Sequence, residues 1–377
     1  MYYTPLVTKH LRFRSAAERH THDSTLLLKY LNEHKYEFTS HDIEEVFSRP
    51  IYLEIIFSQA FQRLKKIHFL GSIDYLINPE GSKPNKRHTR YQHSLGVALL
   101  ALQYSKYRQL TPKEEILCVS SALLHDIGHA PLSHSMEPVL KDYFYLNHHL
   151  ASTKIIQGST TIGEELHRIL LKWDINPSHI LDIIEGTESS RFYEAFGLSI
   201  NIDTIEAILR SQTYIYPNHL SATPSTVLKA LITRSAESTR VLDTFWLIKD
   251  EIYNKLINSN LGVLADHICQ EHLKKNISKY GEDLYFKTED DFKKIEPRLF
   301  KFLSKLSGGI KSYKFISNNS IPFTSRNFVI NHKACLTDAA SINSRYCQHK
   351  TKRSLSIRES IKSDGSSFSP KKSLSLL

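Results

Sequence analysis

The sequence predicts an all-α protein with a minor β-hairpin and extra helices toward the C-terminus. Many segments carry apolar residues at three- and four-residue steps, and this spacing gathers them on one face of a helix. One helix start is especially clear, because Thr111, Pro112 and Glu114 supply a hydroxyl N-cap, a proline in the first turn and an acidic residue near the N-terminus. Strand-like segments are few and are expected only at 73–77 and 313–316.

The expected elements follow one another along the chain. Residues 1–50 are polar, with one short leucine-rich helix expected among them. A strongly amphipathic helix is expected over 51–70, and a hairpin or loop over 71–86, with a turn signal at 78–81. The other helices are expected over 91–107, 112–126, 134–145, 148–157, 160–173, 178–185, 200–212, 224–236, 239–258 and 260–275.

Composition divides the chain into four parts. We expect an N-terminal helical extension over 1–50, a main domain over 51–275 and an accessory region over 276–346. A disordered basic tail rich in serine and lysine is expected over 347–377. The tail prediction rests on the nine serines and the small apolar content of residues 354–377.

The charge of the chain is concentrated at its C-terminus. The formal net charge is +10, and residues 333–377 contribute +6 of it, with nine Lys/Arg against three Asp/Glu. The rest of the protein is therefore only mildly basic, which is consistent with a pocket that attracts phosphates. Charge alone does not select nucleic acid as a partner.

Cysteine usage and hydropathy predict the environment of the protein. The four cysteines have no CxxC spacing, which is typical of a reduced intracellular protein. No apolar segment reaches 18 residues, so neither a transmembrane helix nor a membrane partner is expected. We therefore expect a cytoplasmic protein.

A short segment, 125–134, concentrates three histidines and an aspartate behind an apolar run. The adjacent His125 and Asp126 offer an imidazole nitrogen and a carboxylate oxygen side by side, which suits a divalent metal of intermediate character. His93 lies upstream on the preceding expected helix, and Asp203 lies downstream on another. Four ligands from three helices would meet only in a bundle packed around the metal.

The order His93, then His125-Asp126, then Asp203 resembles the signature of the HD-domain phosphohydrolase superfamily. Residues 61–67 and 90–96, together with the 125–134 block, resemble the SAM-and-HD-domain branch, which includes deoxynucleoside triphosphate triphosphohydrolases. The resemblance covers roughly residues 50–275. It implies an HD-domain helical bundle around a metal site, and metal-dependent hydrolysis of a phosphoester or phosphoanhydride of a nucleotide.

The resemblance also implies the metal ligands, namely His93, His125, Asp126 and Asp203. Two imidazoles and two carboxylates accept Mn, Fe, Zn, Co or Ni, and Mg is a further expectation as a companion of the substrate phosphates. The sequence leaves the choice of metal open.

Further residues take expected roles at the phosphates. The resemblance places His129 and His148 on the phosphate chain, where either could protonate the leaving oxygen, and Glu137 beside one of them. His149 is an alternative to His148, because the two are adjacent. The expected substrate-binding residues are Arg90, Arg210, Lys65 and Phe69.

The substrate pocket departs from the family pattern. The family segment after the last metal aspartate reads Asp-x-x-Asp-Tyr, whereas this chain has Glu206-Ala207 at the last two of those positions. A later family aspartate is Ser211 here, and Phe69 stands where a glutamine often meets the sugar. Loss of such polar groups changes substrate choice by orders of magnitude. The metal and phosphate residues are therefore expected to be intact, while deoxynucleotide selection is not.

Several functions stay open at this point. A cyclic-nucleotide phosphodiesterase and a single-strand nuclease use similar chemistry, although a nuclease needs a basic track, and none is evident outside the tail. A non-catalytic, nucleotide-binding regulatory HD module is the alternative from another class. The expected partner is a nucleotide or small phosphoester, and a homo-oligomer is expected only by analogy with relatives.

Overall fold

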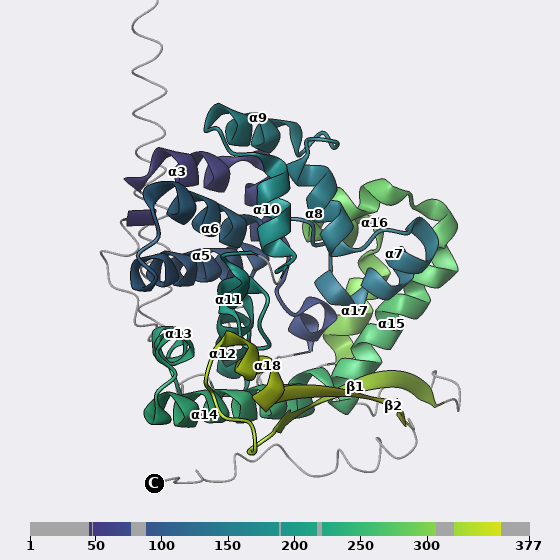
Figure 1. Ribbon diagram of the computed structural model, residues 1–377. Helices are drawn as coiled ribbons and strands as arrows, with labels where there is room; N and C mark the ends of the chain where they lie inside the picture. The colour runs from purple at the N-terminus through teal and green to yellow at the C-terminus, as the bar shows by residue number, and fades with distance from the viewer. Residues whose placement is uncertain are drawn as a thin grey trace, which may run out of the picture.

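The computed structural model describes residues 45–46, 48–76, 88–187, 190–216, 221–306 and 320–355. These residues form a mostly helical protein with one two-stranded sheet, so the predicted all-α class is confirmed (Figure 1). No helix in these ranges is long and apolar enough to cross a membrane.

The helices before residue 220 surround the candidate site. Their bounds are α3 (Pro50–Phe57), α4 (Gln59–Arg63), η1 (Leu64–Lys66), η2 (Gly71–Tyr75), α5 (Arg90–Tyr107), α6 (Pro112–Leu124), η3 (Ser133–Ser135), α7 (Glu137–Phe144), α8 (His148–Ile156), α9 (Glu164–Lys172), α10 (Pro177–Ile184), α11 (Tyr193–Phe196) and α12 (Ile202–Ile215). The later helices are α13 (Pro224–Thr233), α14 (Ala236–Ile252), η4 (Tyr253–Ile257), α15 (Asn260–Asn276), η5 (Ile277–Lys279), η6 (Glu282–Phe286), α16 (Glu289–Ile295), α17 (Pro297–Leu306) and α18 (Ala339–Arg345).

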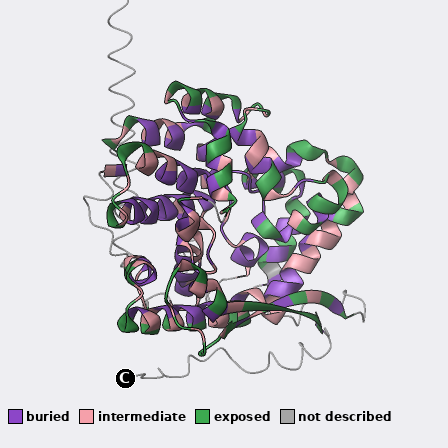
Figure 2. Ribbon diagram, in the orientation of Figure 1, coloured by how far each residue is buried: buried purple, intermediate pink, exposed green. Residues whose placement is uncertain are grey.

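Helix α5 is the centre of the larger hydrophobic core. It is buried on nearly all sides, as expected for a helix that other helices surround. It packs against α6, α12 and α13, and Figure 2 shows this part of the molecule as mainly buried. A second cluster of buried apolar residues lies around α15 and α17. The helices that carry or adjoin the predicted metal ligands, α5, α6 and α12, therefore contribute to the larger hydrophobic core.

Gly96 leaves room on α5 for a buried side chain of α12. A Cβ at this position would overlap with the carboxylate of Glu206 on α12. Any larger residue would therefore displace the Glu206 side chain or α12 itself. Since α12 carries Asp203, the glycine helps to set the distance between two of the predicted ligands.

The capping signals place α6 where the sequence predicts it. Thr111 and Glu114 form a reciprocal capping box, and Pro112 occupies the first turn. The expected single helix over 51–70 is instead divided, because Ser58 leaves the helical conformation after α3 and its side chain accepts a hydrogen bond from Phe61 N at the start of α4.

The β structure lies elsewhere than expected. The strand prediction at 73–77 is wrong for residues 73–75, which form part of η2; buried Asp74 accepts a hydrogen bond from Leu70 N at 2.8 Å and holds the turn. The sheet is formed by β1 (Ile321–Ile330) and β2 (Tyr346–Leu355), which pair antiparallel with Ile321 opposite Leu355. The expected strand at 313–316 lies outside the described residues.

The disordered tail was expected to begin at residue 347, and this boundary is wrong. Residues 346–355 form β2, which is anchored by buried Tyr346 at one end and buried Leu355 at the other. Backbone pairing with β1 stabilises the polar stretch between them. The tail beyond 355, the N-terminal extension up to 44 and the turn at 78–81 lie outside the described residues.

Candidate metal centre

Three helix ends meet beside the core and carry the predicted ligands. His93 lies in the first turn of α5, His125 is the C-cap of α6, and Asp203 lies in the first turn of α12. Asn201 caps α12 and accepts a hydrogen bond from Thr204 N at 2.8 Å, which fixes the start of that helix. Side chains at helix ends can leave the core, so the three converge without disturbing the packing behind them.

The ligand atoms of these residues lie close together. His93 Nε2 is 3.0 Å from Asp203 Oδ1 and 3.1 Å from His125 Nε2. His125 Nε2 is 3.5 Å from Asp203 Oδ1. Asp126 adds Oδ2 at 3.5 Å from His93 Nε2 and Oδ1 at 3.6 Å from His125 Nε2. We call these four residues the His/Asp cluster.

The other nitrogen of each imidazole has a fixed acceptor. His93 Nδ1 lies 2.5 Å from Glu206 Oε2, and His125 Nδ1 lies 2.8 Å from the carbonyl oxygen of Ala122. A carbonyl or carboxylate oxygen needs a donor, so Nδ1 carries the proton in each neutral ring. The two Nε2 lone pairs then face each other, and a cation between them is the arrangement that removes their repulsion. This donor set fits a divalent transition metal.

Electrostatics in the His/Asp cluster favour positive charge. Burial lowers the pKa of His125, but Asp126 and Asp203 outweigh it and raise that pKa to about 9. Burial opposes ionisation of Asp203, yet the neighbouring imidazoles of His125 and His93 hold its pKa below the ordinary value. The Asp203 side chain is still 48% exposed, so the cluster is open on this side.

Asp126 is shared between two neighbours besides the imidazoles. Arg90 Nη1 donates to its Oδ2 at 2.7 Å, and His129 Nε2 lies 3.1 Å from its Oδ1. Burial disfavours the charged carboxylate, but Arg90 and the histidines hold the pKa of Asp126 well below its ordinary value. Arg90 also donates to Ser133 Oγ and to the Phe69 carbonyl. Its guanidinium therefore fixes Asp126 against two loops.

A second group lies on the far side of Asp126 and consists of His129, His134 and His148, which we call the three-histidine cluster. The rings of His129 and His148 stack at 4.5 Å. Glu137 Oε1 lies 2.6 Å from His148 Nδ1, and its Oε2 lies 2.9 Å from His134 Nδ1. Burial and the Arg90 charge lower the pKa of His129 well below its ordinary value, so its ring is neutral near pH 7.

Gly128 brings helix α8 against the turn after α6. A Cβ there would overlap with the carbonyl oxygen of His148 and with the backbone nitrogen of Ser152. The Gly128 amide also donates to Ser152 Oγ at 3.0 Å. This close contact determines that His148, and not His149, faces the cluster. The His149 side chain is half-exposed and lies 3.6 Å from Glu185.

Three of the residues expected to bind substrate have other neighbours. Arg210 was expected at the substrate, but it is fully buried behind the His/Asp cluster, where it pairs with Glu206 and donates to the Gln92 carbonyl. Arg210 therefore fixes the Glu206 carboxylate, which in turn fixes the His93 ring. Lys65 places its Nζ 4.7 Å from the ring centre of Tyr91. Phe69 is buried, with its ring 4.9 Å from that of His93.

The structure adds residues that sequence reasoning did not assign. Glu206 fixes the His93 tautomer, and His134 completes the three-histidine cluster. Lys249 on α14 is buried between Trp246 and Phe328, and burial lowers its pKa to about 7 although the Asp203 charge raises it. Glu206 follows Asp203 by three residues in the sequence, and this helical spacing could have predicted that both side chains lie on the same face of the helix. Lys249 carries no local signal, because only the fold brings α14 to the site.

Glu289 on α16 connects the accessory region to the loops of the site. Its carboxylate accepts hydrogen bonds from the backbone nitrogens of His68 and Leu132 at 3.1 and 3.2 Å, and from Tyr75 Oη at 2.5 Å. Leu132 has a positive φ of 56°, so this bond helps to hold an unfavourable turn. Ser133, the next residue, donates to His68 O and accepts from Arg90.

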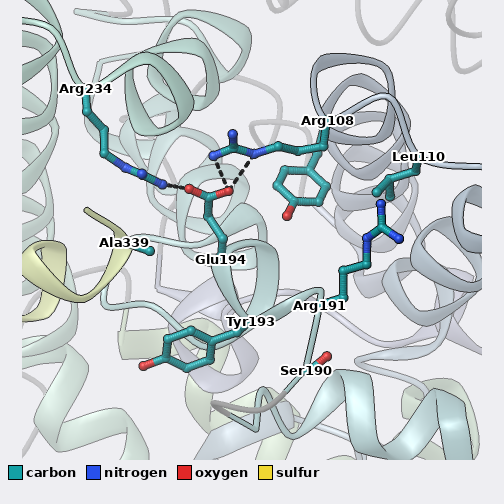
Figure 3. A pocket seen from close by; sticks show the side chains of 9 residues that line it. Arg108, Leu110, Ser190, Arg191, Tyr193, Glu194, Arg234 and Ala339 are labelled. Atoms are coloured by element: carbon teal, nitrogen blue, oxygen red, sulfur yellow. Dashed lines mark hydrogen bonds and ion pairs between the residues drawn. The ribbon is translucent and has the colours of Figure 1, made fainter. Parts of the chain in front are cut away.

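A separate pocket lies at the other end of α5, away from both clusters. It has a volume of about 450 Å³ and is lined by Tyr104, Arg108, Leu110, Ser190, Arg191, Tyr193, Glu194, Arg234 and Ala339. Figure 3 shows Glu194 between the guanidinium groups of Arg108 and Arg234. Arg191 pairs with Glu114. The charged residues that line the pocket are thus paired within the protein, and the pocket has no part in the candidate metal centre.

The comparison with protein families decides the identification. The family described as HD domain matches residues 90–208, the segment that contains all four residues of the His/Asp cluster. Residues 90–208 are an HD domain. The predicted membership of the HD-domain superfamily is therefore confirmed, and the predicted ligands on α5 and α12 and at the end of α6 all lie within the matched segment.

Individual relatives match parts of this chain. An uncharacterised protein of Bacillus subtilis, YwfO, is 27% identical over 187 residues, which cover 45% of this chain and 40% of YwfO. The deoxynucleoside triphosphate triphosphohydrolase SAMHD1 of Gallus gallus is 31% identical over 159 residues, 36% of this chain and 25% of that protein. An uncharacterised protein of Methanocaldococcus jannaschii, MJ1154, is 45% identical over 85 residues, covering 22% of this chain and 17% of MJ1154. The chain therefore spans less than half of each of these three relatives.

Proposed function

We propose that this protein is a metal-dependent phosphohydrolase that acts on a nucleotide or a related small phosphoester. The convergence of His93, His125 and Asp203, with both imidazole Nδ1 atoms bonded to fixed acceptors, is the observation that carries the proposal. The similarity to a deoxynucleoside triphosphate triphosphohydrolase supports the substrate class.

In this proposal the four residues of the His/Asp cluster hold one divalent transition metal. When bound, such a cation acidifies a water molecule and stabilises negative charge on a phosphoryl group. Glu206 and the Ala122 carbonyl keep the two imidazoles in the ligating tautomer. Arg90 keeps Asp126 ionised and in place.

The three-histidine cluster would act on the substrate. Because Glu137 occupies Nδ1 of His148, the Nε2 atom of that ring is left to exchange a proton with the leaving oxygen. His129, neutral and stacked on His148, would donate a hydrogen bond to a phosphate oxygen. Lys249 would supply a buried positive charge on the Asp203 side of the site.

The residues expected beside the sugar do not support selection for deoxynucleotides. Ser211 Oγ donates to the Ala207 carbonyl of its own helix at 2.7 Å, so it presents no free donor to a ligand. Ala207 has no polar side chain, and Phe69 covers His93 with an apolar ring. We infer that the enzyme selects the phosphate group more strictly than the sugar.

A substrate screen tests the proposal. Wild type and His125→Ala are incubated with nucleoside triphosphates, deoxynucleoside triphosphates, monophosphates and cyclic nucleotides, and released phosphate and triphosphate are measured. We expect turnover of at least one class by wild type, none by His125→Ala, and near wild-type turnover by the control His149→Ala. Equal inactivity of wild type and His125→Ala would refute the proposal, and nucleotide binding without turnover would favour a regulatory module.

A further inference from the structure

The ribbon formed by β1 and β2 is basic and contains no acidic residue. None of the residues in either strand is Asp or Glu, whereas Arg326 lies in β1 and Lys350, Lys352 and Arg353 lie in β2. The residues 348–354 are exposed without interruption, and Figure 2 shows this strand at the lower edge of the molecule. Such a run is unusual for a strand in a folded protein, because strands normally bury one face.

The ribbon is nevertheless fixed at both ends. Near one end Phe328 and Tyr346 pack on Trp246 of α14, with ring centres 5.4 Å apart in each pair. At the other end Ile321 and Leu355 are buried in the second hydrophobic cluster. The middle of the ribbon therefore presents its charges on a scaffold that is held in place.

The charges of the ribbon are not balanced within the described part of the chain. Arg326 lies directly opposite Lys350, and like charges in opposite positions destabilise a sheet. Among the described residues, no ion pair is formed by Lys350, Lys352 or Arg353. Lysines on an edge strand also discourage pairing with another chain, but this role does not explain the lack of any acidic residue in either strand.

We propose that the β1–β2 ribbon binds the phosphate backbone of double-helical nucleic acid. A two-stranded ribbon fits the width of a major groove, and lysine and arginine side chains contact phosphates without reading sequence. Single-strand binding relies on exposed aromatic rings for stacking, and insertion into a membrane surface relies on exposed apolar side chains. The exposed stretch 348–354 reads Gln-His-Lys-Thr-Lys-Arg-Ser and contains no Phe, Tyr or Trp and no large apolar side chain. The inference does not depend on the hydrolase activity, since no ribbon residue belongs to either cluster.

Fluorescence anisotropy with the full chain and a labelled duplex of about 24 base pairs tests this inference. Four phosphate contacts predict that log Kobs falls with log salt at a slope of about −3.6, or on the order of 100-fold between about 50 and 200 mM salt. The combined variant Lys350→Gln, Lys352→Gln, Arg353→Gln should lower this slope by about 3 units.

A matched variant controls for net charge. Lys293→Gln, Lys294→Gln, Lys301→Gln removes three exposed lysines from α16 and α17 and should leave binding within about threefold, since these residues lie outside the ribbon. Arg326→Gln, on the other strand, should lower the slope by about 1 unit. This single variant keeps the inference testable if the triple variant does not fold. Equal losses in both triple variants, no duplex binding at low salt, or tighter binding to single strands or to anionic phosphatidylserine vesicles would each overturn the proposal.

Discussion

The His/Asp cluster and the three-histidine cluster meet where Asp126 Oδ1 of the first lies 3.1 Å from His129 Nε2 of the second, and the two clusters differ in charge. In the first, two carboxylates raise the pKa of His125 to about 9, so the group attracts a cation. In the second, burial and Arg90 lower the pKa of His129 well below its ordinary value, so that ring stays neutral near pH 7. The difference teaches that histidines a few ångströms apart can differ in protonation, which suits the two roles proposed for them, holding a metal in the first cluster and contacting a substrate in the second.

The largest effect on this comparison is expected at His148. His148→Ala should lower turnover by about 100-fold or more while bound metal stays at the wild-type level, because the role proposed for this ring is to exchange protons and not to bind the metal. Turnover and metal content are measured on the same preparation, with His149→Ala as the adjacent, half-exposed control. Loss of metal in His148→Ala would show that the two clusters act as one site.

Glu206→Gln should weaken metal affinity by about 10- to 100-fold without removing any ligand. The amide is a poorer acceptor for His93 Nδ1–H and leaves Arg210 without its charged partner. Competition with a metal indicator gives the affinity. An unchanged affinity would mean that the His93 tautomer is set by something other than Glu206.

Lys249→Met should raise KM for an anionic substrate by about tenfold with a smaller effect on kcat, because a single buried charge is lost. The pKa of about 7 means that Lys249 loses its proton as pH rises through 7, so the KM of wild type should also rise between pH 6 and 8. Lys249→Arg keeps its charge over this range and should show a flatter profile. A wild-type KM that does not change with pH would contradict this role.

The last effect is on stability and concerns Glu137. Hydrogen bonds to His134 and His148 outweigh burial and hold the pKa of Glu137 below its ordinary 4.5. As pH falls, Glu137 therefore takes up its proton at a higher pH in the unfolded chain than in the folded protein. The contribution of the Glu137 carboxylate to the free energy of unfolding is complete above about pH 5 and is lost as pH falls further. Glu137→Gln should cost about 2 kcal/mol at pH 7 and progressively less below pH 5 in denaturant unfolding. A difference that grows on acidification would contradict the assignment.

Local signals in the sequence predicted the parts of the fold that short-range interactions determine. Thr111, Pro112 and Glu114 predicted the start of α6 correctly, because a capping box is complete within four residues. The 346–355 strand was missed, since its polar stretch has no alternation of its own and depends on pairing with β1, which begins 25 residues earlier in the chain.

The candidate site shows the same division. The resemblance selected His93, His125 and Asp203, and the structure brings their ligand atoms together. It also named Arg210 as a substrate contact, although burial against Glu206 gives that side chain a different place. Neither the burial of Arg210 nor the approach of Lys249 is encoded in spacing, because both arise from packing between distant helices.

Metal content measured side by side in three proteins tests the central claim most directly. Wild type, Asp203→Ala and His134→Ala are purified identically and analysed by inductively coupled plasma mass spectrometry. The account predicts about one transition metal per chain in wild type and in His134→Ala, and almost none in Asp203→Ala. Full occupancy in Asp203→Ala, or loss in His134→Ala alone, would place the metal in the three-histidine cluster and contradict the account.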